Sequence, residues 1–109
     1  MLEARLYLLQ RASAMLLAPL VLLHLGLILY AIEGGLSADE ILGRTKGSLF
    51  WAGFYGLFVL AAALHAPIGL RNILREWTRL RGRSLDLATV GFALLLLVLG
   101  LRAVWAVTA

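Results

Sequence analysis

Residues 64–77 read LHAPIGLRNILREW and carry a single histidine out of an apolar run into a charged segment. No formally charged residue occurs from Gly47 to Leu70, so the run is long enough to cross a membrane as a helix. His65 would then lie inside the hydrocarbon region, about 9 Å along the helix from Arg71. Because an ionisable side chain at that depth is costly, His65 is the first candidate for a functional residue.

The composition of the chain also indicates a membrane protein. Of the 109 residues, 62% are hydrophobic, which is more than a soluble domain of this length could bury. The net charge of +4 comes mainly from one arginine-rich segment, so it reports orientation and does not indicate nucleic-acid binding. The chain has no cysteine, which excludes disulfides and iron–sulfur ligation by its own side chains. Haem or metal ligation could use only its two histidines and two methionines.

Three uncharged runs predict an all-α integral membrane protein with three transmembrane helices. We expect these helices over residues 12–32, 47–74 and 87–108, in a single membrane domain spanning residues 1–109. A Ser37–Glu40 capping-box spacing predicts a short surface helix over residues 38–43, and residues 75–86 are expected to form the second loop. Pro19 should bend the first helix, because proline removes a backbone donor and crowds the preceding turn. The first run lacks a small-residue cleavage site, so no cleaved signal peptide is expected.

The distribution of basic residues predicts the orientation in the membrane. The connector between the first two spans has two basic residues, offset by three acidic ones. Five arginines instead follow or end the second span: Arg71, Arg75, Arg79, Arg81 and Arg83. By the positive-inside rule, we expect the N-terminus and the second loop in the cytoplasm and the C-terminus outside, in the inner (cytoplasmic) membrane of the cell.

The surroundings of the two histidines are compatible with haem binding. On an α-helix His65 shares one face with Gly69, and small residues beside a histidine leave a slot for a flat macrocycle. His24 shares a face of the first span with Ser13, about 16 Å away. Either histidine could ligate haem iron through its imidazole. An interhelical hydrogen bond is the ordinary alternative for a histidine in a membrane, and spacing alone leaves both readings open.

A longer pattern resembles a known motif. Residues 64–77 are similar to the second-helix motif H-x-x-x-G-[LIM]-R-x-x-x-x-D, followed by an aromatic residue, of succinate dehydrogenase and fumarate reductase membrane anchors. The matching positions are His65, Gly69, Leu70, Arg71, Glu76 and Trp77. Residues 10–14, QRASA, likewise resemble the H-R-x-S-G start of the first helix in those anchors. Gln10, Ala14 and Glu76 depart from the family pattern, which has histidine, glycine and aspartate there.

The resemblance implies a haem b-binding, quinone-reactive subunit that holds a flavoprotein and an iron–sulfur subunit at the membrane. Electrons would pass between those soluble subunits and the quinone pool, and succinate or fumarate is the substrate that the family implies. This chain would not catalyse substrate oxidation alone. His65 carries over as an axial ligand of haem iron. The residues that match positions near haem propionates or the quinone pocket are Arg11, Ser13, Arg71, Glu76 and Trp77.

The two histidines are expected at different depths, because His65 lies about 9 Å from Arg71 and His24 about 20 Å from Arg11 along their helices. One iron could then not take both from the same chain. In the diheme members that this chain resembles, first-helix histidines serve a distal haem and second-helix histidines a proximal one. We expect a second copy of the chain, or a sister anchor, to complete an inner haem at His65 and an outer haem at His24. Arg102 would be available to a propionate of the outer haem.

Two other classes of protein are the alternatives. A small transporter subunit would be expected to place a carboxylate inside the membrane for proton coupling, and the three expected spans contain none. A haem-free structural tether would need neither histidine. The sequence therefore favours the anchor that binds haem and quinone.

Overall fold

The computed structural model of the protein describes residues 2–109; Met1, which we included in the single membrane domain, lies outside the described residues. The described chain consists of α1 (Leu2–Gly34), α2 (Ala38–Thr45), α3 (Leu49–Trp77) and α4 (Gly82–Thr108). Residues 2–109 contain no strand. Because α1, α3 and α4 are each long and apolar enough to cross a membrane, the predicted all-α membrane fold with three spans is confirmed.

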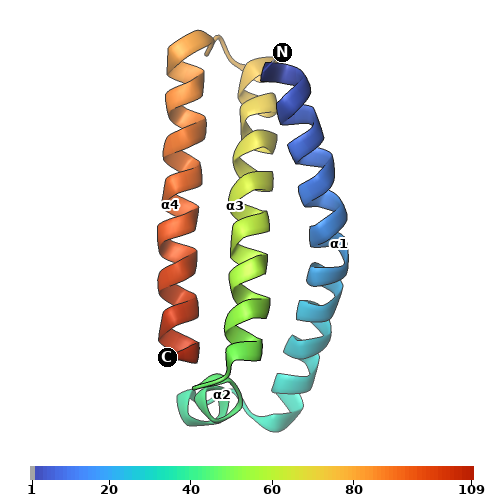
Figure 1. The fold of residues 1–109 in the computed structure, drawn as a ribbon, viewed down its shortest axis with the longest axis vertical. Coiled ribbons are helices and arrows are strands. Elements are labelled where there is room, and N and C mark those ends of the chain that lie inside the picture. Colours follow the sequence, from blue (N-terminus) through green and yellow to red (C-terminus); the bar gives the residue numbers. More distant parts are fainter. Residues whose placement is uncertain (1) are drawn as a thin grey trace.

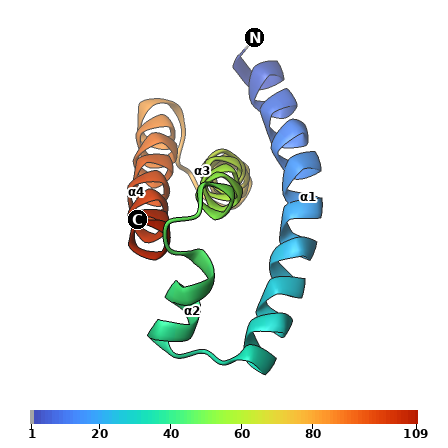
Figure 2. The ribbon, with the colours of Figure 1, turned by 60° about the horizontal axis from the view of Figure 1, so that its bottom comes forward.

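The three long helices lie side by side along the 47 Å axis of the molecule, with α3 in the middle (Figure 1). Both α1 and α4 pack against α3, and they lie on its opposite sides in both views (Figures 1 and 2). Most large apolar side chains on the outer faces are exposed, as expected of helices surrounded by lipid. The few buried apolar residues lie mainly along α3, at Ala61, Ala63 and Ile68.

The helices extend further at the N-terminal end of the bundle than the sequence predicted. α1 begins at Leu2 instead of near residue 12, and α4 begins at Gly82 instead of near residue 87. The second loop consequently covers residues 78–81 and not 75–86. Hydropathy marks only the part of a helix that lies in hydrocarbon, whereas arginine, glutamate and leucine are good helix formers that continue the helix beyond it.

Two prolines lie inside the long helices. Pro19 lies inside α1, which is bowed in Figure 2, in agreement with the bend expected of a proline in a helix interior. Pro67 lies inside α3 and is buried, and the helix continues through it to Trp77.

The short helix α2 closes the other end of the bundle, beside the C-terminus (Figure 1). Ser37 caps α2 by accepting a hydrogen bond from the backbone N–H of Glu40 at 3.2 Å. Thr45 donates from its hydroxyl to the carbonyl of Val107, and the N–H of Gly47 donates to the carbonyl of Thr108 at 2.8 Å. These bonds satisfy two carbonyl groups that the end of α4 would otherwise leave without partners.

Candidate functional site

His65 meets α1 at a polar contact between the helices. Its Nδ1 atom lies 3.3 Å from Ser13 Oγ, and the same oxygen lies 3.0 Å from the backbone carbonyl oxygen of Gln10. Ser13 is 5% exposed, so this contact is shielded from solvent. The side-chain Oε1 of Gln10 is also buried and has no hydrogen-bond partner within residues 2–109. We refer to Gln10, Ser13 and His65 as the His65 cluster.

The small residues near His65 allow the helices to approach each other. A Cβ atom added at Gly69 would lie 3.4 Å from Gln10 Nε2, so the side chain of Gln10 covers this position. Ala61, one turn before His65, is 3% exposed and is packed inside the bundle. Small residues at these positions therefore serve helix packing, and the slot predicted beside His65 is not open on the side that faces Gln10.

Arg71 joins three helices at the N-terminal end of the bundle. Its side chain is 9% exposed and forms ion pairs with Glu3 of α1 at 3.1 Å and with Asp86 of α4 at 3.4 Å. Arg75, one turn further along α3, pairs with Glu3 at 2.9 Å. We refer to these four residues as the Arg71 network. Its two guanidinium groups and two carboxylates carry no net formal charge, so both charges of Arg71 and Arg75 are already balanced within the chain.

The other predicted site residues at this end lie apart from the His65 cluster. Arg11 is exposed and its guanidinium carbon lies 5.8 Å above the ring of Tyr7. Trp77 is 82% exposed at the end of α3. Glu76 lines an open polar cavity of about 400 Å³ together with Asn72, Arg75 and Arg81. Since Glu76 lies eleven residues, about 16 Å, beyond His65 on the same helix, the structure brings Ser13 to His65 and not to Glu76.

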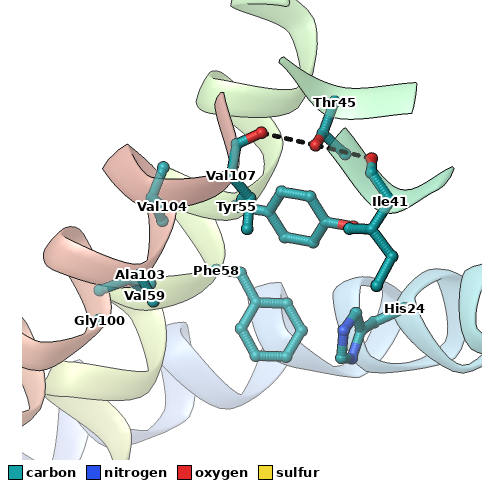
Figure 3. A pocket seen from close by; sticks show the side chains of 10 residues that line it. All are labelled: His24, Ile41, Thr45, Tyr55, Phe58, Val59, Gly100, Ala103, Val104 and Val107. Carbon is teal, nitrogen blue, oxygen red and sulfur yellow. Dashed lines mark hydrogen bonds between the residues drawn. The ribbon is translucent and has the colours of Figure 1, made fainter. Parts of the chain in front are cut away.

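His24 lies in a second, mainly apolar site near α2 (Figure 3). The cavity there has a volume of about 290 Å³ and receives residues from all four helices. We call this cavity the His24 pocket, and its lining residues are His24, Ile41, Thr45, Tyr55, Phe58, Val59, Gly100, Ala103, Val104 and Val107. A second cavity of about 350 Å³ shares four of these residues and continues along α1 and α2. The His24 pocket therefore belongs to a longer apolar recess with a single imidazole.

Aromatic rings of α3 hold the imidazole of His24. Its ring centroid lies 5.2 Å from that of Phe58 and 6.2 Å from that of Tyr55, both in edge-on geometry. In Figure 3 the imidazole lies beside the ring of Phe58, with the side chain of Ile41 of α2 above it. The remaining predicted residue near this end, Arg102, is exposed on α4 and does not line the pocket.

The two imidazoles lie at different levels of the bundle. His24 contacts Phe58, whereas His65 lies seven residues further along α3, which is about 10 Å along the helix axis. The two rings are therefore too far apart to ligate one iron from the same chain. Residues 2–109 contain no group of three or more histidine or acidic side chains that could hold a bare metal ion. Metal ligation by this chain would use a single histidine at each site, as in haem proteins.

Sequence reasoning missed several partners of the predicted residues. The pairing of Glu3 and Asp86 with Arg71 depends on which helices are neighbours, and no local pattern reports that. Tyr55 and Phe58 could have been found, because their spacing of three places both rings on one face of a helix.

The fold and its two intramembrane histidines define the class of this molecule as a multi-pass helical membrane protein. Comparison with family models then gives a match over residues 2–101 to the succinate dehydrogenase/fumarate reductase transmembrane subunit. The chain belongs to this family, which confirms the resemblance seen in residues 64–77. Comparisons with curated proteins and with solved structures found no significant match. Family membership makes the chain a membrane anchor and implies association with a flavoprotein subunit and an iron–sulfur subunit.

Proposed function

We propose that this anchor binds haem b and reacts with quinone, so that electrons pass between the flavoprotein/iron–sulfur pair and the quinone pool. The observation that carries the proposal is the hydrogen bond between Ser13 and His65. It joins residues 10–14 and 64–77, the two stretches that resemble the motifs of the family. The bond engages one ring nitrogen of an intramembrane imidazole and leaves the other for a ligand. This is the arrangement that metal-ligating histidines commonly adopt.

The residues of the His65 cluster fit a haem ligand. His65 is half-buried between α1 and α3, and its ring is oriented by a buried hydroxyl. Haem bound there by two histidines would supply one-electron transfer without an open iron position. Arg71 already has two carboxylate partners, so a propionate there would have to share the guanidinium with them or replace one of them. Arg11 would bind a propionate more readily, because its contact is with the ring of Tyr7 and not with a carboxylate.

The His24 pocket supports a second haem site in the proposal. The lining residues are almost all apolar, and α4 contributes only glycine, alanine and valine residues to them. Arg102 lies between Gly100 and Ala103 in the sequence of α4 and is exposed. We propose that its long side chain reaches a propionate of this haem. Because the two imidazoles lie at different levels, each iron would need a second ligand from another chain. A second copy of this chain is proposed as the donor, and a sister anchor is the rival.

The quinone site is proposed at the N-terminal end of the bundle. Glu76 and Trp77 lie at the exposed end of α3, next to a polar cavity lined by Arg75 and Arg81. Arg11 is proposed to complete this site, whereas Ser13, which the family motif also suggests, lies beside His65 and not beside Glu76. The basic second loop supports a cytoplasmic location for this end, in the inner membrane, where it would attract the soluble subunits.

The haem part of the proposal is tested by a dithionite-reduced minus oxidised visible spectrum of the purified complex. We expect a sharp α-band of low-spin haem b, and we expect the His65→Ala variant to lose the component bound at the His65 cluster. A His65→Ala spectrum identical to that of the wild type would refute ligation by His65. A colourless wild-type complex with intact partners would leave the haem-free tether as the function.

The quinone part is tested with two exposed tryptophans at opposite ends of the bundle. Trp77→Ala should raise the KM for a water-soluble quinone analogue several-fold, because it removes a ring proposed to contact the headgroup. Trp105→Ala is the matched control, since Trp105 is similarly exposed, at 74%, near the C-terminus. Equal effects of the two substitutions, or an effect of Trp105→Ala alone, would refute a quinone site at the end of α3.

A further inference from the structure

The hydroxyl of Ser13 has two polar contacts but only one proton. It lies 3.0 Å from the backbone carbonyl oxygen of Gln10 and 3.3 Å from Nδ1 of His65. A carbonyl oxygen can only accept a hydrogen bond, whereas an imidazole nitrogen can donate or accept according to its tautomer. The contact with Gln10 is therefore a hydrogen bond only if Ser13 donates its proton there.

Donation to Gln10 is the preferred use of that proton. The contact with the carbonyl is the shorter of the two, and a serine inside a helix commonly donates to the carbonyl one turn earlier. If Ser13 instead donated to Nδ1, two acceptor oxygens would face each other at 3.0 Å with no proton between them. Ser13 is 5% exposed, so solvent offers little relief from that arrangement.

The partner nitrogen must then supply the second hydrogen bond. With its proton directed to Gln10, Ser13 can meet Nδ1 of His65 only as an acceptor, which requires a proton on Nδ1. A neutral imidazole has a single ring proton, so Nε2 is left with a free lone pair. The hydrogen bonds run from His65 to Ser13 and from Ser13 to the carbonyl of Gln10.

We propose that Ser13 is a positioning residue that holds His65 in the Nδ1–H tautomer and so presents Nε2 to a ligand. The tautomer itself requires no cofactor, whereas its consequence for haem rests on the function proposed above. Ser13 thereby acts through His65 and not as a direct contact of quinone. The chain of two hydrogen bonds also makes the imidazole a stronger electron donor to a metal at Nε2.

The tautomer can be measured directly by ¹⁵N NMR of the ring nitrogens in the full chain with labelled histidine, purified in lipid without added haem. We expect His65 to show a protonated Nδ1 and an unprotonated Nε2, with His65→Asn identifying its signals. Ser13→Ala should shift the ring toward the Nε2–H form, and Ser13→Thr, which keeps the hydroxyl, should not. An Nε2–H tautomer in the wild-type chain would overturn the proposal whether or not the protein binds haem.

The haem-loaded complex gives a second readout, the midpoint potential of the haem at His65. Loss of the hydrogen bond in Ser13→Ala should weaken electron donation by the imidazole and shift the potential upward. Ser13→Thr should restore the wild-type potential, and Ser84→Ala, at an exposed serine near the start of α4, should not change it. An unchanged potential in Ser13→Ala would overturn the positioning role, while absence of haem from the wild type would instead refute the proposed function.

Discussion

The His65 cluster and the His24 pocket place the same side chain in opposite surroundings. His65 is hydrogen-bonded to a buried serine hydroxyl and lies on the side of the bundle held by the Arg71 network. His24 is held by the edges of two aromatic rings inside an apolar recess. The difference shows that His65 has a polar group against one ring nitrogen, and in our proposal this contact leaves the other nitrogen for a ligand. At His24 the packing fixes the ring position, and the observed contacts do not select a tautomer.

The two ends of the bundle are also held together differently. Ion pairs between three helices close the end nearer His65, whereas backbone carbonyls of α4 bonded by Thr45 and Gly47 close the end nearer His24. Close packing of α3 against α4, where Gly100 meets Val59, also holds together the end nearer His24. A substitution in any one of these features should therefore disturb the packing at one end of the bundle more than at the other.

The largest loss of stability is expected from Arg71→Ala. Removing a side chain that is 9% exposed breaks two ion pairs, and leaves Asp86 without this partner while Glu3 keeps Arg75. We expect a cost of about 2 kcal/mol, between the values for buried and surface pairs, because both carboxylates are about half exposed. Unfolding titrations in mixed micelles measure it. Arg75→Ala, at a side chain that is 47% exposed, is the matched control and should cost less than about 1 kcal/mol.

A glycine substitution tests the packing beside the His24 pocket. A Cβ added at Gly100 would lie 2.5 Å from Cγ1 of Val59, a stiff branched side chain, so Gly100→Ala should force α3 and α4 apart. We expect a cost of about 1–2 kcal/mol. Gly91→Ala is the control on the same helix, because a Cβ there meets nothing within 4 Å. The packing argument fails if the two substitutions have the same effect, or if Gly100→Ala/Val59→Ala does not recover stability.

The smallest effect is expected at the link between α2 and α4. Thr45→Val keeps the shape of the side chain but removes its hydrogen bond to the carbonyl of Val107, which should cost about 1 kcal/mol. Thr89→Val is the control, because that hydroxyl bonds only to Leu85 of its own helix. Amide hydrogen exchange near the end of α4 should increase in Thr45→Val and not in Thr89→Val. Unchanged exchange in Thr45→Val would show that the side-chain bond does not hold this end together.

The sequence was sufficient for the spans and for the motif at His65. Long uncharged runs predict membrane helices because hydrocarbon admits few other structures, and a histidine inside such a run is conspicuous. The ends of α1 and α4 were placed too far inward, because charged residues outside the hydrocarbon do not end a helix. The spacing of three between Tyr55 and Phe58 also predicts an aromatic face on this helix, which the structure places against His24.

Contacts between helices could not be predicted from single-helix patterns. The meeting of Ser13 with His65, and of Glu3 and Asp86 with Arg71, joins residues that are far apart in the sequence. Such pairs depend on the level at which neighbouring helices lie and on how each is rotated, which periodicity within one helix does not report. The same limit explains why the sequence groups Ser13 with the quinone residues of the family and does not report its contact with the imidazole of His65.

The haem content per chain, measured by pyridine haemochrome on the purified complex, tests the central claim that the two histidines serve separate haems. For two copies of the chain sharing two bis-histidine haems, we predict about one haem per chain. We expect this ratio to fall to about one half in either His65→Ala or His24→Ala, because each haem has its own pair of axial histidines. A wild-type ratio near zero, or a ratio that His65→Ala leaves unchanged, would contradict the account.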